Sequence, residues 1–279
     1  MVMISVIMSV GYKPKLLKKT VDSVLNQTYE DFEFLIVDDS CKQSVKNELK
    51  KFKNPKIRII WNKKPIGLTK SLNKALKISK GKYIARIDNG DICRKDRFRQ
   101  QLAFMTKYPK VAVVGSDVNV INTKGKIIGY VEYPSSNKEI KNGLLRTNLF
   151  AHSTLFFRKN ILDTEGFYDE EFYYAQDYEL LLRIAAKYSI GNIKEKLVDY
   201  LFDEKGITLD TSKRKKQDKF ALQAKKKAIE EYGYENKKDY LISKIEALVP
   251  MNIKRSLLRF INRNKEVNLK GKKMFIKTK

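Results

Sequence analysis

The sequence contains few of the residues that build disulfide frameworks or zinc sites. Among its 279 residues there are two cysteines, Cys41 and Cys93, and one histidine, His152. This set is too small for a disulfide framework and for a zinc site made of Cys and His ligands. We therefore expect a protein of the cytosol, where free cysteines are the rule.

Long apolar runs and glycine-rich phosphate loops are also missing. No run reaches the ~20 apolar residues that a helix needs to span a bilayer. Residues 1–10 are apolar but carry neither a basic region nor a cleavage-site pattern, so we expect no signal peptide. The absence of GxGxxG and P-loop patterns disfavours a dinucleotide-binding fold and a Walker-type ATPase.

Acidic residues are scarce relative to basic ones. The chain has 58 Lys and Arg against 32 Asp and Glu, a net charge of +26. Residues 213–279 hold 21 Lys and Arg against 7 Asp and Glu, so this stretch carries +14 of the total. Such charge attracts polyanions, which include nucleic acid, an anionic membrane surface and phosphorylated substrates. With 42% hydrophobic residues, the chain can form one large domain or a domain with an appendage.

The first half of the chain alternates strand and helix patterns. This alternation is typical of a parallel sheet with crossover helices. Gly81 follows the second helix and is expected to cap it, while Trp61 ends a strand and is expected in the core. The predicted strands cover 4–10, 32–37, 57–61 and the start of 83–91, and the predicted helices cover 14–26 and 67–81.

The second half is less regular and predicts a mixed or antiparallel part. Short apolar runs occur with no long helix between them. From Ser212 on, short Lys-rich helices are expected. The predicted strands cover 111–114, 126–131 and 154–157, and the predicted helices cover 97–105 and 177–187.

Two of the predicted strands run directly into acidic residues. Asp38 and Asp39 end the second strand, and Asp88 and Asp91 follow the fourth one in an Asp-Asn-Gly-Asp turn. Ligands of open α/β sheets bind beyond the carboxyl ends of strands, and paired carboxylates there suit a hard divalent cation held with a phosphate. Taken alone, the same four residues also suit a solvated turn.

Eight segments, in this order and spacing, resemble an inverting nucleotide-sugar glycosyltransferase of family 2, which has the GT-A fold. Each segment is weak alone, but together they are a strong signal over about residues 3–200, and they are most similar to bacterial transferases of surface-polysaccharide assembly. The segments are 4–10 (ISVIMSV), 23–29 (SVLNQTY), 31–40 (DFEFLIVDDS), 67–73 (GLTKSLN), 81–88 (GKYIARID), 96–101 (DRFRQQ), 152–153 (HS) and 175–180 (AQDYEL).

The resemblance implies an architecture and a reaction. The fold would be a GT-A, Rossmann-like α/β domain with a mixed sheet and helices on both faces, over residues 1–210. Residues 211–279 would form a basic, mostly helical C-terminal appendage. The protein would move a sugar from a nucleotide diphosphate, with UDP favoured, to a hydroxyl of a growing surface glycan or lipid-linked saccharide, with inversion.

The resemblance also implies individual roles. Donor-nucleotide binding is implied for Ser9, Asp38, Asp39, Asn62, Lys70 and Asp88. Asp88 and Asp91 would hold Mg²⁺ or Mn²⁺ with the diphosphate, and Asp177 would be the general base. His152 and Gln176 are the candidates on the acceptor side.

These residue types suit the implied chemistry. An inverting transfer needs a carboxylate that takes the proton of the acceptor hydroxyl as its oxygen attacks the anomeric carbon. It also needs positive charge on the departing diphosphate, which a metal ion or Lys and Arg side chains supply. Two structural interpretations stay open. Asp177 also suits the N-terminus of a helix, where the dipole favours an acid, and His152 also suits a structural loop.

The sequence departs from the family pattern at two positions. Gly90 stands where the family usually has the second Asp of its Asp-x-Asp metal motif, and glycine has no ligand atom. Metal binding then rests on Asp88 or Asp91, or is weak, or the protein is inactive. Gln176 replaces a Glu that often precedes the base, which keeps a hydrogen bond and removes a negative charge.

The basic tail contains an amphipathic pattern at residues 251–263, with four apolar residues on one side and basic residues on the rest. The pattern is typical of a helix lying in an anionic membrane interface, and equally of a helix packed on the catalytic domain. A peripheral contact with the inner face of the plasma membrane would suit an acceptor built on a polyprenyl phosphate.

Two rival functions are compatible with parts of the sequence. The charge would suit a nucleic-acid-binding protein, but the aromatic-basic interleaving and the motifs of such proteins are missing, so no specific nucleic-acid partner is expected. Gly90 would suit a catalytically degenerate homologue that acts as a partner subunit.

Overall fold

Strand β1 (Ile4–Val10) lies at the centre of the parallel half of the sheet. The computed structural model describes residues 2–11, 14–202, 211–248, 267–269 and 272–276. All seven residues of β1 are buried, which explains its unbroken apolar sequence. It pairs in parallel with β2 (Phe32–Asp38) on one side and with β4 (Tyr83–Arg86) on the other, and β3 (Ile57–Trp61) extends the sheet beyond β2. The helices of this half are α1 (Pro14–Leu25), α2 (Gln43–Leu49) and α3 (Leu68–Ile78).

The rest of the sheet is mixed, as predicted. β8 (Phe156–Arg158) is antiparallel to β4 and to β6 (Val111–Ile121). β9 (Ser189–Leu201) runs parallel to β6 and also pairs with the short β5 (Ile92–Cys93). β7 (Ile127–Glu132) is antiparallel to β6. Around these strands lie α4 (Arg97–Lys107), α5 (Asn137–Leu144), the 3₁₀ turn η1 (His152–Thr154), α6 (Lys159–Glu165) and α7 (Gln176–Lys187).

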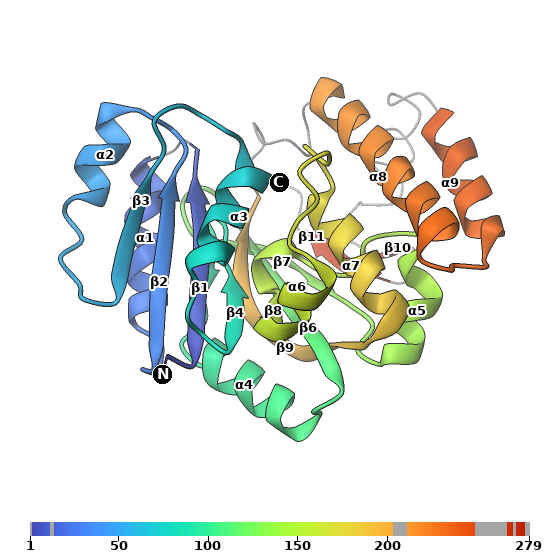
Figure 1. Ribbon diagram of the computed structural model, residues 1–279, viewed down its shortest axis with the longest axis horizontal. Coiled ribbons are helices and arrows are strands. Elements are labelled where there is room, and N and C mark those ends of the chain that lie inside the picture. The colour runs from blue at the N-terminus through green and yellow to red at the C-terminus, as the bar shows by residue number, and fades with distance from the viewer. Residues whose placement is uncertain (1, 12–13, 203–210, 249–266, 270–271, 277–279) are drawn as a thin grey trace.

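Helices cover both faces of the sheet. Side chains along a strand point alternately to opposite faces, so the buried apolar strands contribute to a core on each face. Ile7 of β1 lies in one core together with residues of α3, α5 and α7, whereas Val6 and Met8 lie in a second core with residues of α1, α2 and α4. Figure 1 shows α3 and α1 on opposite sides of these strands. The predicted GT-A-like α/β architecture is therefore present.

The C-terminal stretch packs on the body of the protein. Helix α8 (Thr211–Glu231) contributes Ala224 and Ala228 to the first core, and α9 (Lys237–Leu248) follows on its outer side. Strands β10 (Val267–Leu269) and β11 (Lys272–Ile276) form an antiparallel pair, and β11 joins the sheet beside β7. The sequence patterns do not predict these two strands. The boundary between 1–210 and 211–279 stays a prediction, and residues 251–263 lie outside the described residues.

Two expectations about single residues are wrong. Helix α3 ends at Ile78, so Gly81 does not cap it; a Cβ at Gly81 would lie 2.3 Å from the backbone nitrogen of Ser5, so glycine permits the close approach of β1. Trp61 is 40% exposed, because β3 is an edge strand. Within the described residues, no helix combines the length and the apolar character needed to cross a bilayer.

Candidate active site

The carboxyl ends of β1, β2 and β4 place three predicted donor residues at one edge of the sheet. Ser9 lies opposite Val37 in the parallel pairing of β1 with β2, and Asp39 comes two residues after Val37. The pairing of β1 with β4 continues to Ile87, whose amide donates to the carbonyl of Ile7 at 3.2 Å, and Asp88 follows directly. Open α/β sheets bind ligands at such an edge.

Asp39 ties the end of β2 to the start of α3. Its carboxylate accepts hydrogen bonds from the backbone amides of Ile66 at 2.7 Å and Gly67 at 2.9 Å, and from the Asn62 side chain at 2.9 Å. Gly67 has a φ of +89°, a conformation that favours glycine, and precedes α3. The carboxylate therefore fixes the loop that leads into this helix.

Asp38 forms a tight local turn. Its Oδ1 accepts from the amide of Ser40 at 3.0 Å and from the Ser40 hydroxyl at 2.6 Å, while its Oδ2 is buried without a hydrogen-bond partner. Asn62 is also buried, and accepts from Lys74 at 2.6 Å. Lys70 is exposed on the first turn of α3 and lies outside this network. The structure thus brings Asp38, Asp39 and Asn62 together, with Lys70 free to face solvent.

The Asp-Asn-Gly-Asp turn is built around the hydroxyl of Ser153. This hydroxyl donates to Asp88 at 3.1 Å and also bonds to Oδ2 of Asp91. The other oxygen of Asp91 accepts from the amide of Leu201 at 2.8 Å, and Asp91 is only 3% exposed. Asp91 is therefore a buried link between the turn and the end of β9, and both of its oxygens have protein donors.

Asp88 is paired with an arginine from the end of its own strand. Nη2 of Arg86 donates to Oδ1 of Asp88, and the Asp88 side chain remains 37% exposed. Burial raises the pKa of Asp88, but the Arg86 charge and the hydrogen bonds outweigh it, so the pKa is lowered. Burial and the neighbouring charge of Asp88 raise the pKa of Asp91 to about 7. Of the two acids of this turn, Asp88 is thus the charged and accessible one at neutral pH.

The residues at this turn do not fit a divalent cation. Gly90 offers no ligand atom, and Asp91 uses both oxygens inside the protein. Asp88 already has a cationic partner in Arg86. In the part of the chain that the structure describes, no three His, Cys, Asp or Glu side chains are grouped so as to hold a metal ion. Hard cations prefer carboxylate oxygens, and Asp88, the acid of this turn with an exposed side chain, is already paired with Arg86.

Asp177 lies in the first turn of α7. The residue before the helix, Ala175, has a φ of +58°, so the chain enters the helix through a left-handed turn. Nδ2 of Asn148 donates to Oδ2 of Asp177 at 2.9 Å and holds the half-buried carboxylate. The preceding Gln176 is buried. The positive end of the helix dipole favours the ionised form of an acid at this position.

His152 and Tyr168 connect the two sets of carboxylates. Nε2 of His152 lies 3.0 Å from the hydroxyl of Tyr168. Burial, followed by the charge of Arg86, lowers the pKa of His152 to about 4, so its imidazole is neutral at pH 7. Burial also raises the pKa of Tyr200, and the charges of Asp91, Asp88 and Asp177 raise it further. The charges of Asp88 and Asp177 thus both act on the same three groups, His152, Tyr168 and Tyr200.

Sequence patterns did not single out Arg86, Asn148, Ser153 or Tyr168. Arg86 and Ser153 lie inside the family-like segments, but a buried arginine and a serine carry no chemistry that a local pattern identifies. Asn148 and Tyr168 lie outside those segments, and only the fold brings them to Asp177 and His152.

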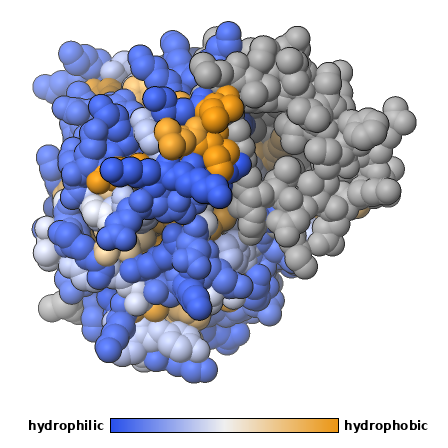
Figure 2. Space-filling model, turned by 90° about the vertical axis from the view of Figure 1, so that its right-hand side faces the viewer, coloured by the Kyte–Doolittle hydropathy of each residue, from blue (hydrophilic) through white to orange (hydrophobic). Residues whose placement is uncertain are grey.

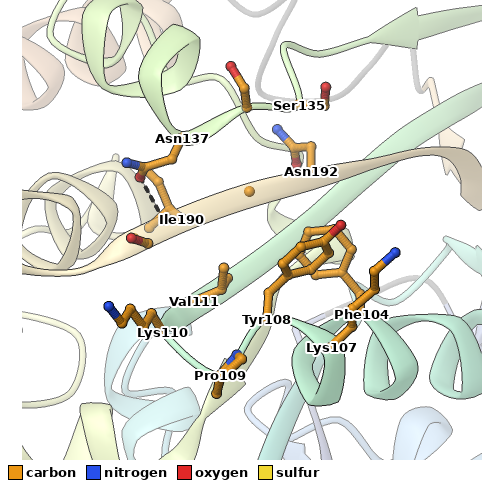
Figure 3. A pocket seen from close by; sticks show the side chains of 13 residues that line it. Phe104, Lys107, Tyr108, Pro109, Lys110, Val111, Ser135, Asn137, Ile190 and Asn192 are labelled. Carbon is orange, nitrogen blue, oxygen red and sulfur yellow. Dashed lines mark hydrogen bonds between the residues drawn. The ribbon is translucent and has the colours of Figure 1, made fainter.

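One cavity, of about 600 Å³, lies away from these residues. Figure 3 shows its lining, with the aromatic rings of Phe104 and Tyr108 on one side and Asn137 bonded to the amide of Ile190 at 3.0 Å on the other. The lining includes the first residues of β6 and β9, so the cavity lies at the amino ends of these strands. It contains none of the predicted site residues.

The chain is similar to known proteins in sequence and in fold. Residues 5–166 match the model of Glycosyl transferase family 2. The O-antigen biosynthesis glycosyltransferase WbnJ of Escherichia coli is 34% identical over 209 residues, which cover 73% of this chain and 81% of that protein.

Two solved structures share the fold at 17% identity. The crystal structure of S. aureus TarS 1–349 in complex with UDP-GlcNAc has a TM-score of 0.67 and matches 85% of this chain and 69% of that chain. The mannosyltransferase PcManGT from Pyrobaculum calidifontis, in complex with GDP-Man and Mn²⁺, has a TM-score of 0.66 and matches 88% of this chain and 68% of that one.

Proposed function

The chain belongs to glycosyl transferase family 2, and from this premise we propose that it transfers a sugar, with inversion, from a UDP-linked donor to a hydroxyl of a surface glycan or lipid-linked saccharide. One observation carries the proposal. Asp39 and Asp88 follow strands on either side of β1, and the charges of Asp88 and Asp177 both act on His152 and Tyr168, which supports a single site for the three acids. A donor bound at the strand ends therefore presents its sugar toward Asp177.

Asp177 is the proposed general base. Within the described chain only Asn148 donates to its carboxylate, at Oδ2, so Oδ1 is free for an acceptor hydroxyl. As the acceptor oxygen bonds to the anomeric carbon, its proton passes to Asp177, and the nucleoside diphosphate leaves with the electrons of the broken bond. His152, whose Nε2 lies 3.0 Å from the hydroxyl of Tyr168, is proposed to orient a hydroxyl through hydrogen bonding, while Asp177 removes the proton.

The donor side is proposed to use the loop that Asp39 fixes. By holding the amides of Ile66 and Gly67, Asp39 sets the path of the chain beside the end of β2. Ser9 and Asn62 line the adjoining strand ends, and the exposed Lys70 offers positive charge at the start of α3. Nucleotide selectivity for UDP rests on this loop in our proposal, and TarS, solved with UDP-GlcNAc, has the same fold.

Substituting Asp177 tests the proposed base. In a panel of UDP-sugars, Asp177→Asn is expected to lower donor hydrolysis by about a thousandfold. UDP binding should stay unchanged, because Asp177 faces the acceptor. Asp163→Asn, an exposed acid on α6, is the matched control and should keep full turnover. Unaltered turnover in Asp177→Asn would overturn the assignment. No turnover with any donor would favour a catalytically degenerate partner subunit.

We also propose a peripheral contact with the inner face of an anionic membrane. Helix α9 exposes 55% of Leu241 and 65% of Ile245, which are one helical turn apart. Figure 2 shows an orange patch among blue residues on the side of the molecule where α9 lies. Exposed Lys237, Lys238 and Lys244 belong to the same helix. Apolar residues among lysines are typical of helices that lie in a membrane interface, where a lipid-linked acceptor would be found.

A further inference from the structure

Arg86 is a fully buried arginine at the centre of the candidate site. It is the last residue of β4, and none of its surface is exposed. Its Nη2 donates to Asp88, whereas Nε and Nη1 have no hydrogen-bond partner. Buried charges are normally paired through all of their polar groups. Arg86 and Asp88 therefore form an ion pair without net charge, in which two nitrogens of the guanidinium make no further hydrogen bond.

The fold holds this charge firmly in place. The carbonyl of Arg86 accepts from the buried guanidinium of Arg97 at 2.7 Å, and its amide donates to the carbonyl of Leu155 at 2.9 Å. Ser153, which bonds to both acids of the turn, follows directly after His152 in the segment that packs on β4. The Arg86 side chain therefore has a fixed position below the turn.

The turn around Arg86 lacks the means to bind a metal ion. Gly90 supplies no side-chain oxygen, Asp91 is buried and bonded inside the protein, and the exposed carboxylate of Asp88 has a cation beside it. A second cation at Asp88 would be repelled by the guanidinium. A bare Asp88, in contrast, would repel the phosphates of a nucleotide donor. The charge of Arg86 disfavours a metal ion at Asp88, and it also neutralises the Asp88 carboxylate that would otherwise repel the phosphates.

We propose that Arg86 is the resident countercharge of Asp88 in the donor site, and that the protein binds nucleoside diphosphates without a divalent cation. This inference rests on the proposed function of the same site. Arg86 has no exposed surface, so it acts through Asp88 as a positioning residue. It neutralises the charge of the Asp88 carboxylate, which faces the diphosphate, and it orients this carboxylate. The departing diphosphate then lies beside an Asp-Asn-Gly-Asp turn whose exposed carboxylate is neutralised.

Calorimetry of UDP binding tests the proposal on the unmodified protein first. UDP affinity in a chelating buffer should equal the affinity in excess Mn²⁺, and Mn²⁺ titrated into the UDP-bound protein should give no binding heat. UDP binding that requires Mn²⁺ or Mg²⁺ would overturn the inference and leave the proposed function standing. No UDP binding in either buffer would overturn the UDP donor and the inference together.

Substitutions then test the role of Arg86. Arg86→Met leaves Asp88 uncompensated and should weaken UDP binding by about tenfold or more, while Arg86→Lys should keep most of the affinity. The double variant Arg86→Met with Asp88→Asn should recover affinity, because the repelling charge is gone. Failure of the double variant to recover would overturn the neutralising role.

A matched control separates this effect from a loss of structure. Arg158 is also a strand arginine with a largely internal role, and it bonds to the hydroxyl of Tyr83 at 3.1 Å and the carbonyl of Val111 at 2.8 Å, away from the turn. Arg158→Met should lower the melting temperature and keep UDP affinity. An equal loss of UDP affinity in Arg158→Met and Arg86→Met would overturn the proposal.

Discussion

His152 is the only histidine of the chain, and its surroundings keep its imidazole neutral. Burial and the Arg86 charge lower its pKa to about 4 from the ordinary 6.5. Its Nε2 is engaged with the hydroxyl of Tyr168 at 3.0 Å. A neutral imidazole anchored in this way can orient an acceptor hydroxyl through a hydrogen bond.

The lowered pKa of His152 predicts a pH dependence of stability. Below pH 6.5 the unfolded chain takes up a proton at this residue, while the folded chain resists it until about pH 4. The folded state therefore loses stability as the pH falls through this window, and its His152 contribution is complete above it. Urea unfolding across the window should show the loss in the wild type.

The His152→Asn variant isolates this contribution, because it has no titrating group at the position. The stability of the wild type relative to this variant should fall steadily from pH 6.5 towards pH 4 and stay constant above pH 6.5. A difference that does not change with pH would contradict the buried, neutral state of the imidazole.

At this scale the sequence predicts the acids better than their partners. Asp88 and Asp177 stand out because they lie in two of the segments that resemble the family. Their partners Arg86 and Asn148 become recognisable only when strands and helices distant in the sequence come together. Asp91 looks the same as Asp88 in the sequence, yet burial and the neighbouring charge of Asp88 raise its pKa to about 7.

The turn between β4 and β5 depends on a glycine for its shape. Gly90 has a φ of +112°, which side chains other than glycine rarely adopt. Its amide donates to the hydroxyl of Thr20 at 2.8 Å, so the turn is tied to α1. A Cβ at this position would also lie 2.9 Å from Cδ2 of Leu201 in β9. The residue that removes a metal ligand thus also sets the geometry of the turn.

Replacing this glycine should destabilise the fold. Gly90→Ala is expected to cost about 1–3 kcal/mol, through the strained backbone and the contact with Leu201. Gly233→Ala is the matched control, because Gly233 also has a positive φ, +76°, but nothing lies within 4 Å of its added Cβ. Chemical denaturation should give a larger loss for Gly90→Ala. Equal losses would mean that the Leu201 contact contributes nothing.

Elements with unbroken apolar patterns were predicted closely, and elements with buried polar residues were not. β1 and β2 agree with the predicted strands because both of their faces are covered, and the apolar edge strand β3 also agrees. β6 was predicted to end at Val114, but it continues through the buried Ser116 and Asp117 to Ile121. Asp117 accepts from the amide of Tyr133 at 2.8 Å, a partner that the local pattern does not reveal.

The strand β9 shows the same limit. Its middle contains Asn192, Lys194 and Lys196, so its sequence lacks the alternation of a typical strand. Asn192 is nevertheless buried, because its side chain donates to the carbonyls of Pro134 at 3.0 Å and Leu149 at 3.1 Å. The strand is stable through contacts distant in the sequence.

Across the whole molecule, the basic charge and the exposed apolar residues of the C-terminal stretch favour a membrane contact on a surface separate from the proposed donor site. Figure 1 shows β3 at one end of the molecule and α8 and α9 at the other. The stretch from residue 213 onward carries +14 of the net charge of +26. Leu241 and Ile245 of α9 are exposed in this stretch, away from the strand ends that bind the donor in our proposal. A membrane contact through α9 would therefore leave the parallel half of the sheet open to the donor.

Vesicle co-sedimentation tests this contact. The wild type should sediment with vesicles of anionic phospholipid and much less with zwitterionic ones, and added salt should weaken binding because the attraction of lysines is screened. The double variant Leu241→Ser with Ile245→Ser removes the exposed apolar pair and should reduce binding by about tenfold. Trp61→Ser removes an exposed apolar side chain of β3, at the opposite end of the molecule, and should bind as the wild type does. If the double variant sediments as well as the wild type, α9 is not the membrane contact, because a charge-only attraction would not need its apolar residues.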